Sequence, residues 1–165
     1  MRAGLRAAVG TYAASVGLAA ALLPARVPLH FGASGAVDRY GSRTEALVHF
    51  GLLGVGLLAV WAGCHQLVRR VGLQLVNVPH ADYWKAPERE PELRTRLQVD
   101  LDRLFAATFL LCAVIAAATL AAARGDGRLP WWFGVGFAAY LLWTAREVWH
   151  LTTRRYRPPA GPAPP

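Results

Sequence analysis

Four ionisable side chains lie together in one short polar segment near the start of the chain, namely His30, Asp38, Arg39 and Arg43. A histidine changes its charge near neutral pH, and arginines form paired hydrogen bonds with carboxylates and phosphates. His49 follows a few residues later and can lie at the same end of the molecule. We expect these five side chains to bind a ligand, such as a peptide, a lipid or another component of the cell envelope.

Two other interpretations of these residues stay open. Asp38 can accept hydrogen bonds from nearby backbone amides, and His30 can pair with Asp38 or cap a helix end, so both can be structural. Alternatively, His30, Asp38 and His49 can form a polar pocket for a zinc or copper ion, or for an enzyme that acts on lipid. Metal sites normally use three or four protein ligands, and the chain carries no established catalytic motif. We therefore expect no catalytic residues, no metal and no cofactor.

Four apolar stretches divide the chain, at about residues 7–23, 46–68, 104–123 and 130–151. Each approaches or meets the ~20 apolar residues that a helix needs to cross a ~30 Å hydrocarbon core. The chain is 55% hydrophobic and 17% charged, which leaves little for a soluble core. The predicted fold class is all-α, an integral membrane bundle of four transmembrane helices. Residues 1–157 form its single membrane domain, with a compact extracytoplasmic loop over residues 24–45 and an inner loop over residues 69–103.

Basic residues beside the apolar stretches predict the orientation. With both termini in the cytoplasm, twelve of the 18 basic residues lie inside and five outside, as the positive-inside rule requires. The net charge of +8 favours anionic lipid of the bilayer over nucleic acid as a partner, because the basic residues flank apolar spans and form no continuous surface. The bias toward arginine is typical of a high-GC bacterial genome, so we expect the cytoplasmic (plasma) membrane of a bacterium. The first stretch also resembles a secretory signal peptide, although its length favours a retained span.

The outer loop is too rich in turn-forming residues for a simple linker. Pro24 and Pro28 stop a helix, and three glycines permit turns with positive φ. Phe31 and Tyr40 offer apolar surface that can be buried. These features predict a compact cap that lies on the outer ends of the helices.

The run LPARVPLHFGASGAVDRYGSR in this loop resembles the signature of a family of bacterial membrane proteins, domain of unknown function 1648. The matching positions are Leu23, Pro24, Val27, Pro28, His30, Phe31, Gly35, Asp38, Gly41, Ser42 and Arg43. The segment from Asn77 to Arg89 resembles one that follows the second span in some of these proteins. The best understood relatives are immunity proteins against a secreted toxin of the Sdp type, which protect the producer and signal to a repressor. The resemblance thus implies a role in immunity and signalling. This chain is shorter than the immunity proteins of the Sdp type.

The sequence of the inner loop predicts a cytoplasmic amphipathic helix in its C-terminal part. Pro91 suits the first turn of a helix, and leucines recur along one face after it. Tyr83 and Trp84 precede this helix and can anchor a turn at the lipid headgroups or dock a cytoplasmic partner protein. Beyond the last span, the proline-rich residues 158–165 are expected to be disordered.

We favour a binding or sensing protein of the immunity type, in which the outer loop recognises an envelope ligand and the inner loop reports it to a membrane or cytoplasmic partner. One alternative is an accessory subunit of a membrane transporter, for which Arg146 and Glu147 in the last span would matter. The scarcity of charge within the spans argues against transport by this chain alone. The other alternative is the membrane enzyme that acts on lipid, which predicts a deep polar pocket beneath the cap.

Overall fold

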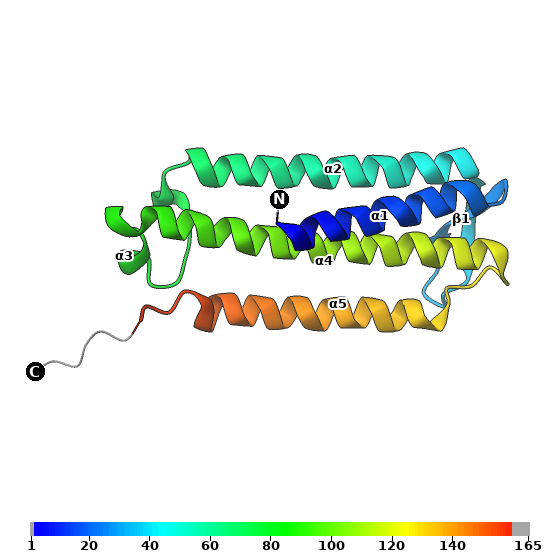
Figure 1. The fold of residues 1–165 in the computed structure, drawn as a ribbon. Coiled ribbons are helices and arrows are strands. Elements are labelled where there is room, and N and C mark those ends of the chain that lie inside the picture. The colour runs from blue at the N-terminus through cyan, green and yellow to red at the C-terminus, as the bar shows by residue number, and fades with distance from the viewer. Residues whose placement is uncertain (1, 160–165) are drawn as a thin grey trace, which may run out of the picture.

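A computed structural model of the chain describes residues 2–159 (Figure 1). The elements in chain order are α1 (Ala3–Leu22), β1 (Arg26–Phe31), β2 (Val37–Ser42), α2 (Arg43–Arg70), α3 (Ala81–Trp84), α4 (Glu90–Arg124) and α5 (Trp131–His150). Short 3-10 turns cover Leu73–Leu75 and Pro87–Arg89, and a π-helical turn over Leu151–Arg155 follows α5. Most of the tail predicted to be disordered, residues 160–165, lies outside the described residues.

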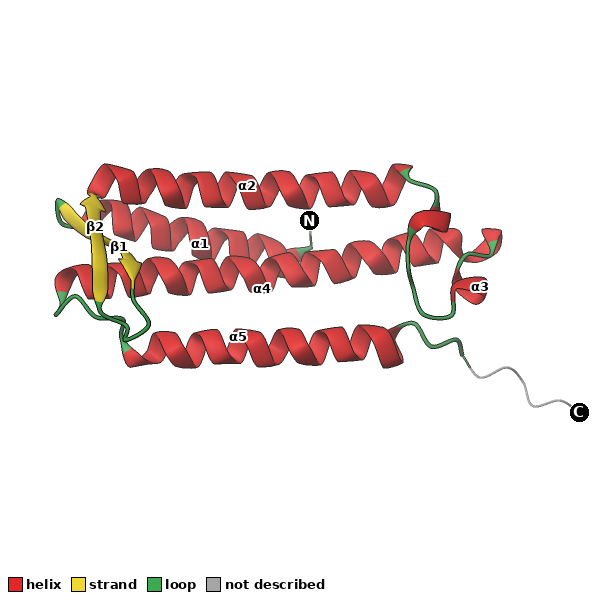
Figure 2. Cartoon of the chain, turned by 180° about the vertical axis from the view of Figure 1, so that it is seen from behind, coloured by secondary structure: helices red, strands yellow, loops and turns green. Residues whose placement is uncertain are grey.

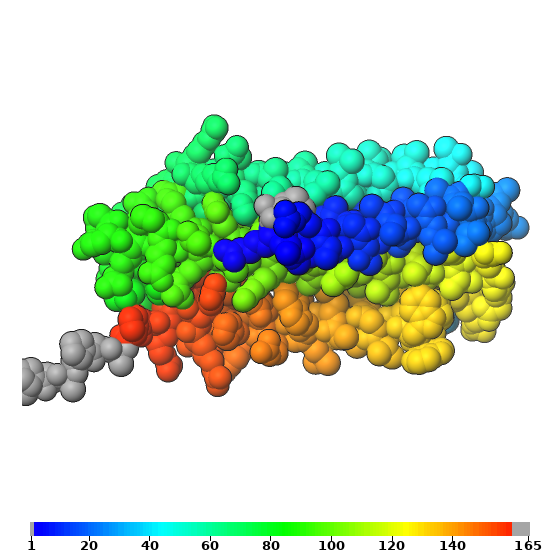
Figure 3. All heavy atoms as spheres, in the orientation of Figure 1, coloured from blue at the N-terminus to red at the C-terminus, as the bar shows by residue number. Residues whose placement is uncertain are grey.

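The four long helices form a mostly helical bundle around α4, which contacts each of the other three. Helices α1 and α2 pack on one side of α4 and α5 on the other, and α5 runs beside α4 for most of its own length (Figures 1 and 2). The space-filling view shows α5 as an outer layer below the other helices (Figure 3). We call the end that carries the strands the hairpin end and the opposite end the α3 end.

Three helices are long and apolar enough to cross a membrane: α1, α2 and the 38-residue stretch Pro87–Arg124 that contains α4. The outward faces are also apolar, as Leu52, Val55 and Val60 of α2 illustrate, each more than half exposed. An apolar surface of this kind is stable against lipid tails and unfavourable in water. The chain therefore has the features of a membrane protein, and a fourth span at α5 stays a prediction.

The outer loop contains a two-stranded antiparallel hairpin, an element that the all-α prediction did not include. Arg26 pairs with Ser42 and Val27 with Gly41. Gly35 lies in the connecting turn with φ of +74°, a conformation that glycine adopts without strain. The turn is tied to the connection between α4 and α5, because the Leu129 amide donates to the Gly35 carbonyl at 2.9 Å. The hairpin thus links the first half of the chain to the last two helices.

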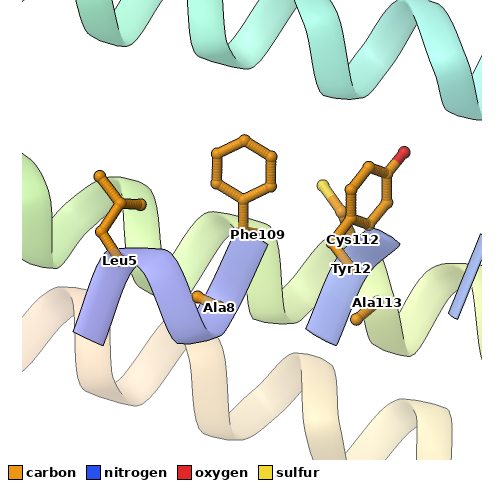
Figure 4. Close-up of a cluster of buried hydrophobic side chains, with 6 residues drawn as sticks. All are labelled: Leu5, Ala8, Tyr12, Phe109, Cys112 and Ala113. Atoms are coloured by element: carbon orange, nitrogen blue, oxygen red, sulfur yellow. The ribbon is translucent and has the colours of Figure 1, made fainter. Parts of the chain in front are cut away.

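Helix α1 contributes half of the main buried cluster, which joins Leu5, Ala8 and Tyr12 to Phe109, Cys112 and Ala113 of α4 (Figure 4). The Tyr12 hydroxyl donates to the Phe50 carbonyl of α2 at 2.6 Å, which holds the ring between three helices. Gly54 of α2 faces this ring: a Cβ atom there would lie 2.7 Å from Tyr12 Cε1. Close approach of α1 and α2 therefore depends on glycine at position 54.

We expect Gly54→Ala to lower the free energy of unfolding by about 1–3 kcal/mol, because the Tyr12 ring is anchored and cannot move away without losing its hydrogen bond. Gly56→Ala is the matched control, since nothing lies within 4 Å of a Cβ atom at Gly56. There the higher helix propensity of alanine should stabilise the protein by up to ~1 kcal/mol. Thermal unfolding in detergent should give opposite shifts for the two variants, and equal shifts would contradict the packing described.

Candidate functional site

The hairpin brings two of the predicted residues into direct contact. His30 Nδ1 lies 2.6 Å from Asp38 Oδ1, and the two side chains are 67% and 52% exposed. Because a carboxylate only accepts, the imidazole donates through Nδ1. His30 and Asp38 thus form an exposed pair on the surface of the cap, outside any described cavity.

Several motif residues hold the cap on the helices. Ser42 is the N-cap of α2, since its Oγ accepts from the Glu45 amide at 3.0 Å. Arg43 Nη2 donates to the Ala20 carbonyl in the last turn of α1, where a cation also meets the negative end of the helix dipole. A Cβ atom at Gly41 would lie 2.1 Å from Leu29 Cδ1, so a larger residue does not fit without a shift. Ser42, Arg43 and Gly41 therefore have structural contacts.

Arg39 and His49 line a cavity of about 270 Å³ between the hairpin and the ends of α2 and α4. Its apolar walls include Phe31, Phe50 and Ile115. Arg39 Nη2 lies 2.5 Å from Glu45 Oε1, and the Arg39 side chain is 63% exposed. His49 Nδ1 lies 2.7 Å from the Glu45 carbonyl, so Nδ1 donates and Nε2 stays free to accept.

The structure therefore divides the predicted ligand-binding set. Arg39 and His49 share a cavity, whereas His30 and Asp38 pair on the exposed cap. The Arg43 guanidinium donates to a carbonyl at the end of α1. Within residues 2–159, no group of three or more histidine, cysteine or acidic side chains is placed to hold a metal ion. The alternative of a metal site built from His30, Asp38 and His49 is thus wrong for these residues.

Sequence reasoning missed a polar centre nearer the α3 end, at Asp102. Its Oδ1 accepts from Trp61 Nε1 at 2.7 Å and lies 3.0 Å from His65 Nε2. Its Oδ2 accepts from the Arg2 amide at 3.1 Å, at the N-terminus of α1. Asp102 is only 5% exposed and so connects α1, α2 and α4. An acidic residue directly before a predicted span was the available signal, but its partners depend on which helices are neighbours.

Trp84, one of the two residues predicted to dock a partner protein, is buried and has a structural contact. Trp84 is 2% exposed, and its Nε1 donates to the Tyr156 carbonyl at 2.6 Å. The Tyr156 hydroxyl donates in turn to Asp100 Oδ2 at 2.8 Å, and burial together with this hydrogen bond raises the pKa of Tyr156. Tyr83 is half-buried, with the Arg89 guanidinium 3.8 Å from its ring centre. These aromatic residues hold the inner loop against the end of α5.

Arg146 and Glu147 lie beside Arg103 of α4 in the structure. Glu147 is buried, with Oε1 3.7 Å from Arg103 of α4 and Oε2 3.9 Å from Arg146. The three charged side chains form a local cluster that links α5 to α4 near the α3 end.

The fold and the cap define a small helical membrane protein with a polar hairpin on one end. Residues 8–55 match the model of the family described as Domain of unknown function (DUF1648), so this part of the chain is similar to that family. The matched segment covers most of α1, the hairpin and the first part of α2, which confirms the resemblance carried by the outer-loop motif. No curated protein and no solved structure matched the chain.

Proposed function

We propose that this protein is a non-enzymatic binding or sensing protein that recognises a hydrophobic peptide of the cell envelope at its hairpin end. The proposal rests on the cavity between the hairpin and α2, where Arg39 and His49 lie beside apolar side chains. Such a cavity suits an apolar side chain together with a carboxylate, which Arg39 can bind by charge-assisted hydrogen bonds. The free Nε2 of His49 can accept from a peptide amide.

The proposed topology has four spans, with both termini in the cytoplasm of a bacterium and the hairpin outside the plasma membrane. The run of α5 beside α4 supports the fourth span, because a helix packed along a spanning helix lies at the same depth (Figure 2). The buried α1 residues Leu5, Ala8 and Tyr12 support a retained first span over a cleaved signal peptide. Anionic lipid is the proposed counter-charge for the basic residues at the α3 end.

Immunity of the Sdp type is the process that best fits a peptide-binding membrane protein of this family. Ligand binding between the hairpin and α2 can be passed to the α3 end, because α2 and α4 are continuous helices that join both ends. A membrane or cytoplasmic protein would then read the change at the α3 end. Outer-loop variants that keep the fold should lose the response.

The binding site is tested with fluorescent hydrophobic peptides that carry either a free or an amidated C-terminus, added to the protein in lipid nanodiscs. We expect the free acid to bind at least about tenfold more tightly and Arg39→Gln to remove that difference, because a hydrogen bond to a charged group contributes ~1.5–3 kcal/mol. Arg26→Gln is the control, since Arg26 lies on the same hairpin, 4.2 Å from the Tyr40 ring centre, and does not line the cavity. Equal binding of acid and amide would contradict the proposal.

A further inference from the structure

A second cavity lies between α4 and α5, nearer the α3 end than the peptide site. It has a volume of about 430 Å³, within the range of small-molecule sites. Its walls are almost wholly apolar and include Ala107, Leu110 and Val114 of α4 and Ala139 and Trp143 of α5. We call it the α4–α5 groove. One charged residue borders it, Arg103, whose side chain is 52% exposed.

A smaller cavity with charged residues in its lining continues the groove. It has a volume of about 250 Å³ and shares Arg103 and Ala106 with the groove, while Arg2 lines its other side. Asp102 also lines it, but the Asp102 oxygens already accept hydrogen bonds from Trp61 and the Arg2 amide, and one lies 3.0 Å from His65. Asp102 keeps its negative charge, but Arg2 and Arg103 together outweigh it, so the lining of this cavity has a net positive charge that can attract an anion.

The position of Arg103 relates this pair of cavities to the bilayer. Arg103 directly precedes the apolar part of α4, residues 104–123, whereas the groove walls lie within that part. An apolar groove at hydrocarbon depth with cations at its mouth complements an anionic phospholipid: the cations match the phosphate, and the apolar walls match an acyl chain. Arginine is the side chain best suited to phosphate, because its planar fork donates two parallel hydrogen bonds.

We propose that the α4–α5 groove and the cavity beside it form one site for an anionic phospholipid. One acyl chain lies in the groove along α4 and α5, and the phosphate lies between Arg103 and Arg2. Glu147, 3.7 Å from Arg103, faces the guanidinium from α5 and holds it at the mouth of the groove. The site is independent of the peptide cavity, because it shares no lining residue with it.

The test uses native mass spectrometry of the delipidated full-length protein with phosphatidylglycerol, phosphatidylcholine and inorganic phosphate. We expect one phosphatidylglycerol to stay bound, and Arg103→Gln to weaken its binding about tenfold, as for loss of a charge-assisted hydrogen bond. Arg146→Gln is the control, because Arg146 also contacts Glu147 but is 73% exposed and does not line the groove. Equal weakening in both variants, or equal binding of the two lipids, would overturn the site.

Two further measurements test the contribution of the acyl chain and that of the headgroup separately. Ala139→Leu fills the groove and should reduce bound phosphatidylglycerol several-fold, whereas Ala138→Leu, next to it on α5 and outside the groove lining, should not. Inorganic phosphate in excess should fail to displace the lipid. Displacement by phosphate alone, with no effect of Ala139→Leu, would show a simple anion site and overturn the lipid assignment.

Discussion

Asp102→Ala should lower the free energy of unfolding by about 3 kcal/mol or more. The substitution leaves the Trp61 indole N–H, the His65 ring and the Arg2 amide without their shared acceptor. Each buried polar group that loses its partner costs ~1–3 kcal/mol. Because these groups belong to α1 and α2, the packing of both helices against α4 should weaken at the same time. The melting temperature in detergent should fall by roughly 6–12 °C for a chain of this size.

Asp126→Ala is the matched control for this experiment. Asp126 is exposed, and its Oδ1 accepts only from the nearby Arg128 amide, at 3.1 Å. Surface substitutions of this kind change stability by about 0.5 kcal/mol or less. Asp102→Asn should lie between the two, since the amide keeps one acceptor oxygen. A melting temperature of Asp102→Ala equal to that of Asp126→Ala would show that the polar centre does not hold the bundle.

Trp84→Ala should have an effect of similar size, about 3–5 kcal/mol. Trp84 is buried against Leu73, Val78, Leu93 and Tyr156, and its N–H is bonded to the Tyr156 carbonyl. Removing it leaves a cavity as well as an unpaired carbonyl, and the inner loop should detach from α4. Hydrogen exchange across residues 73–93 measures that detachment directly.

Trp84→Phe helps to separate packing from hydrogen bonding, because it keeps a six-membered aromatic ring in the core but loses the N–H donor and the smaller ring of the indole. We expect it to cost ~1–2 kcal/mol. Trp131→Ala is the control at a tryptophan that is 81% exposed. If Trp84→Ala leaves the exchange of the inner loop unchanged, Trp84 is not a structural anchor, and the docking role becomes possible again.

The helices were predictable because their signals are local. Each apolar stretch coincides with one long helix, to within a residue at the ends that pass beyond it, but the start of α2 at Arg43 was missed, because the outer loop was predicted to run to residue 45. Ser42 and Glu45 have the spacing of a capping box, and Ser42 does cap the helix. The hairpin was missed because Pro28 lowers the strand signal, although it lies in β1 opposite Tyr40.

The polar contacts were less predictable because they join distant parts of the chain. The pairing of His30 with Asp38 was one of the open structural interpretations, and it is local to the hairpin. The partners of Asp102 lie far from it in sequence, in α1 and α2, and the Trp84 partner Tyr156 follows α5. Such contacts follow from helix packing, for which the sequence carries no local signal.

The central proposal is that the cavity between the hairpin and α2 binds a hydrophobic peptide through Arg39. The most direct test is photo-crosslinking of the acid-terminated peptide, with a diazirine on its last apolar side chain, to the protein in nanodiscs. Mass spectrometry of the products should place the crosslinks at cavity residues such as Phe31, Phe50 and Ile115, and the amidated peptide should give far fewer. Crosslinks spread evenly over the lipid-facing surfaces of α2 and α5, with equal yields for acid and amide, would contradict it.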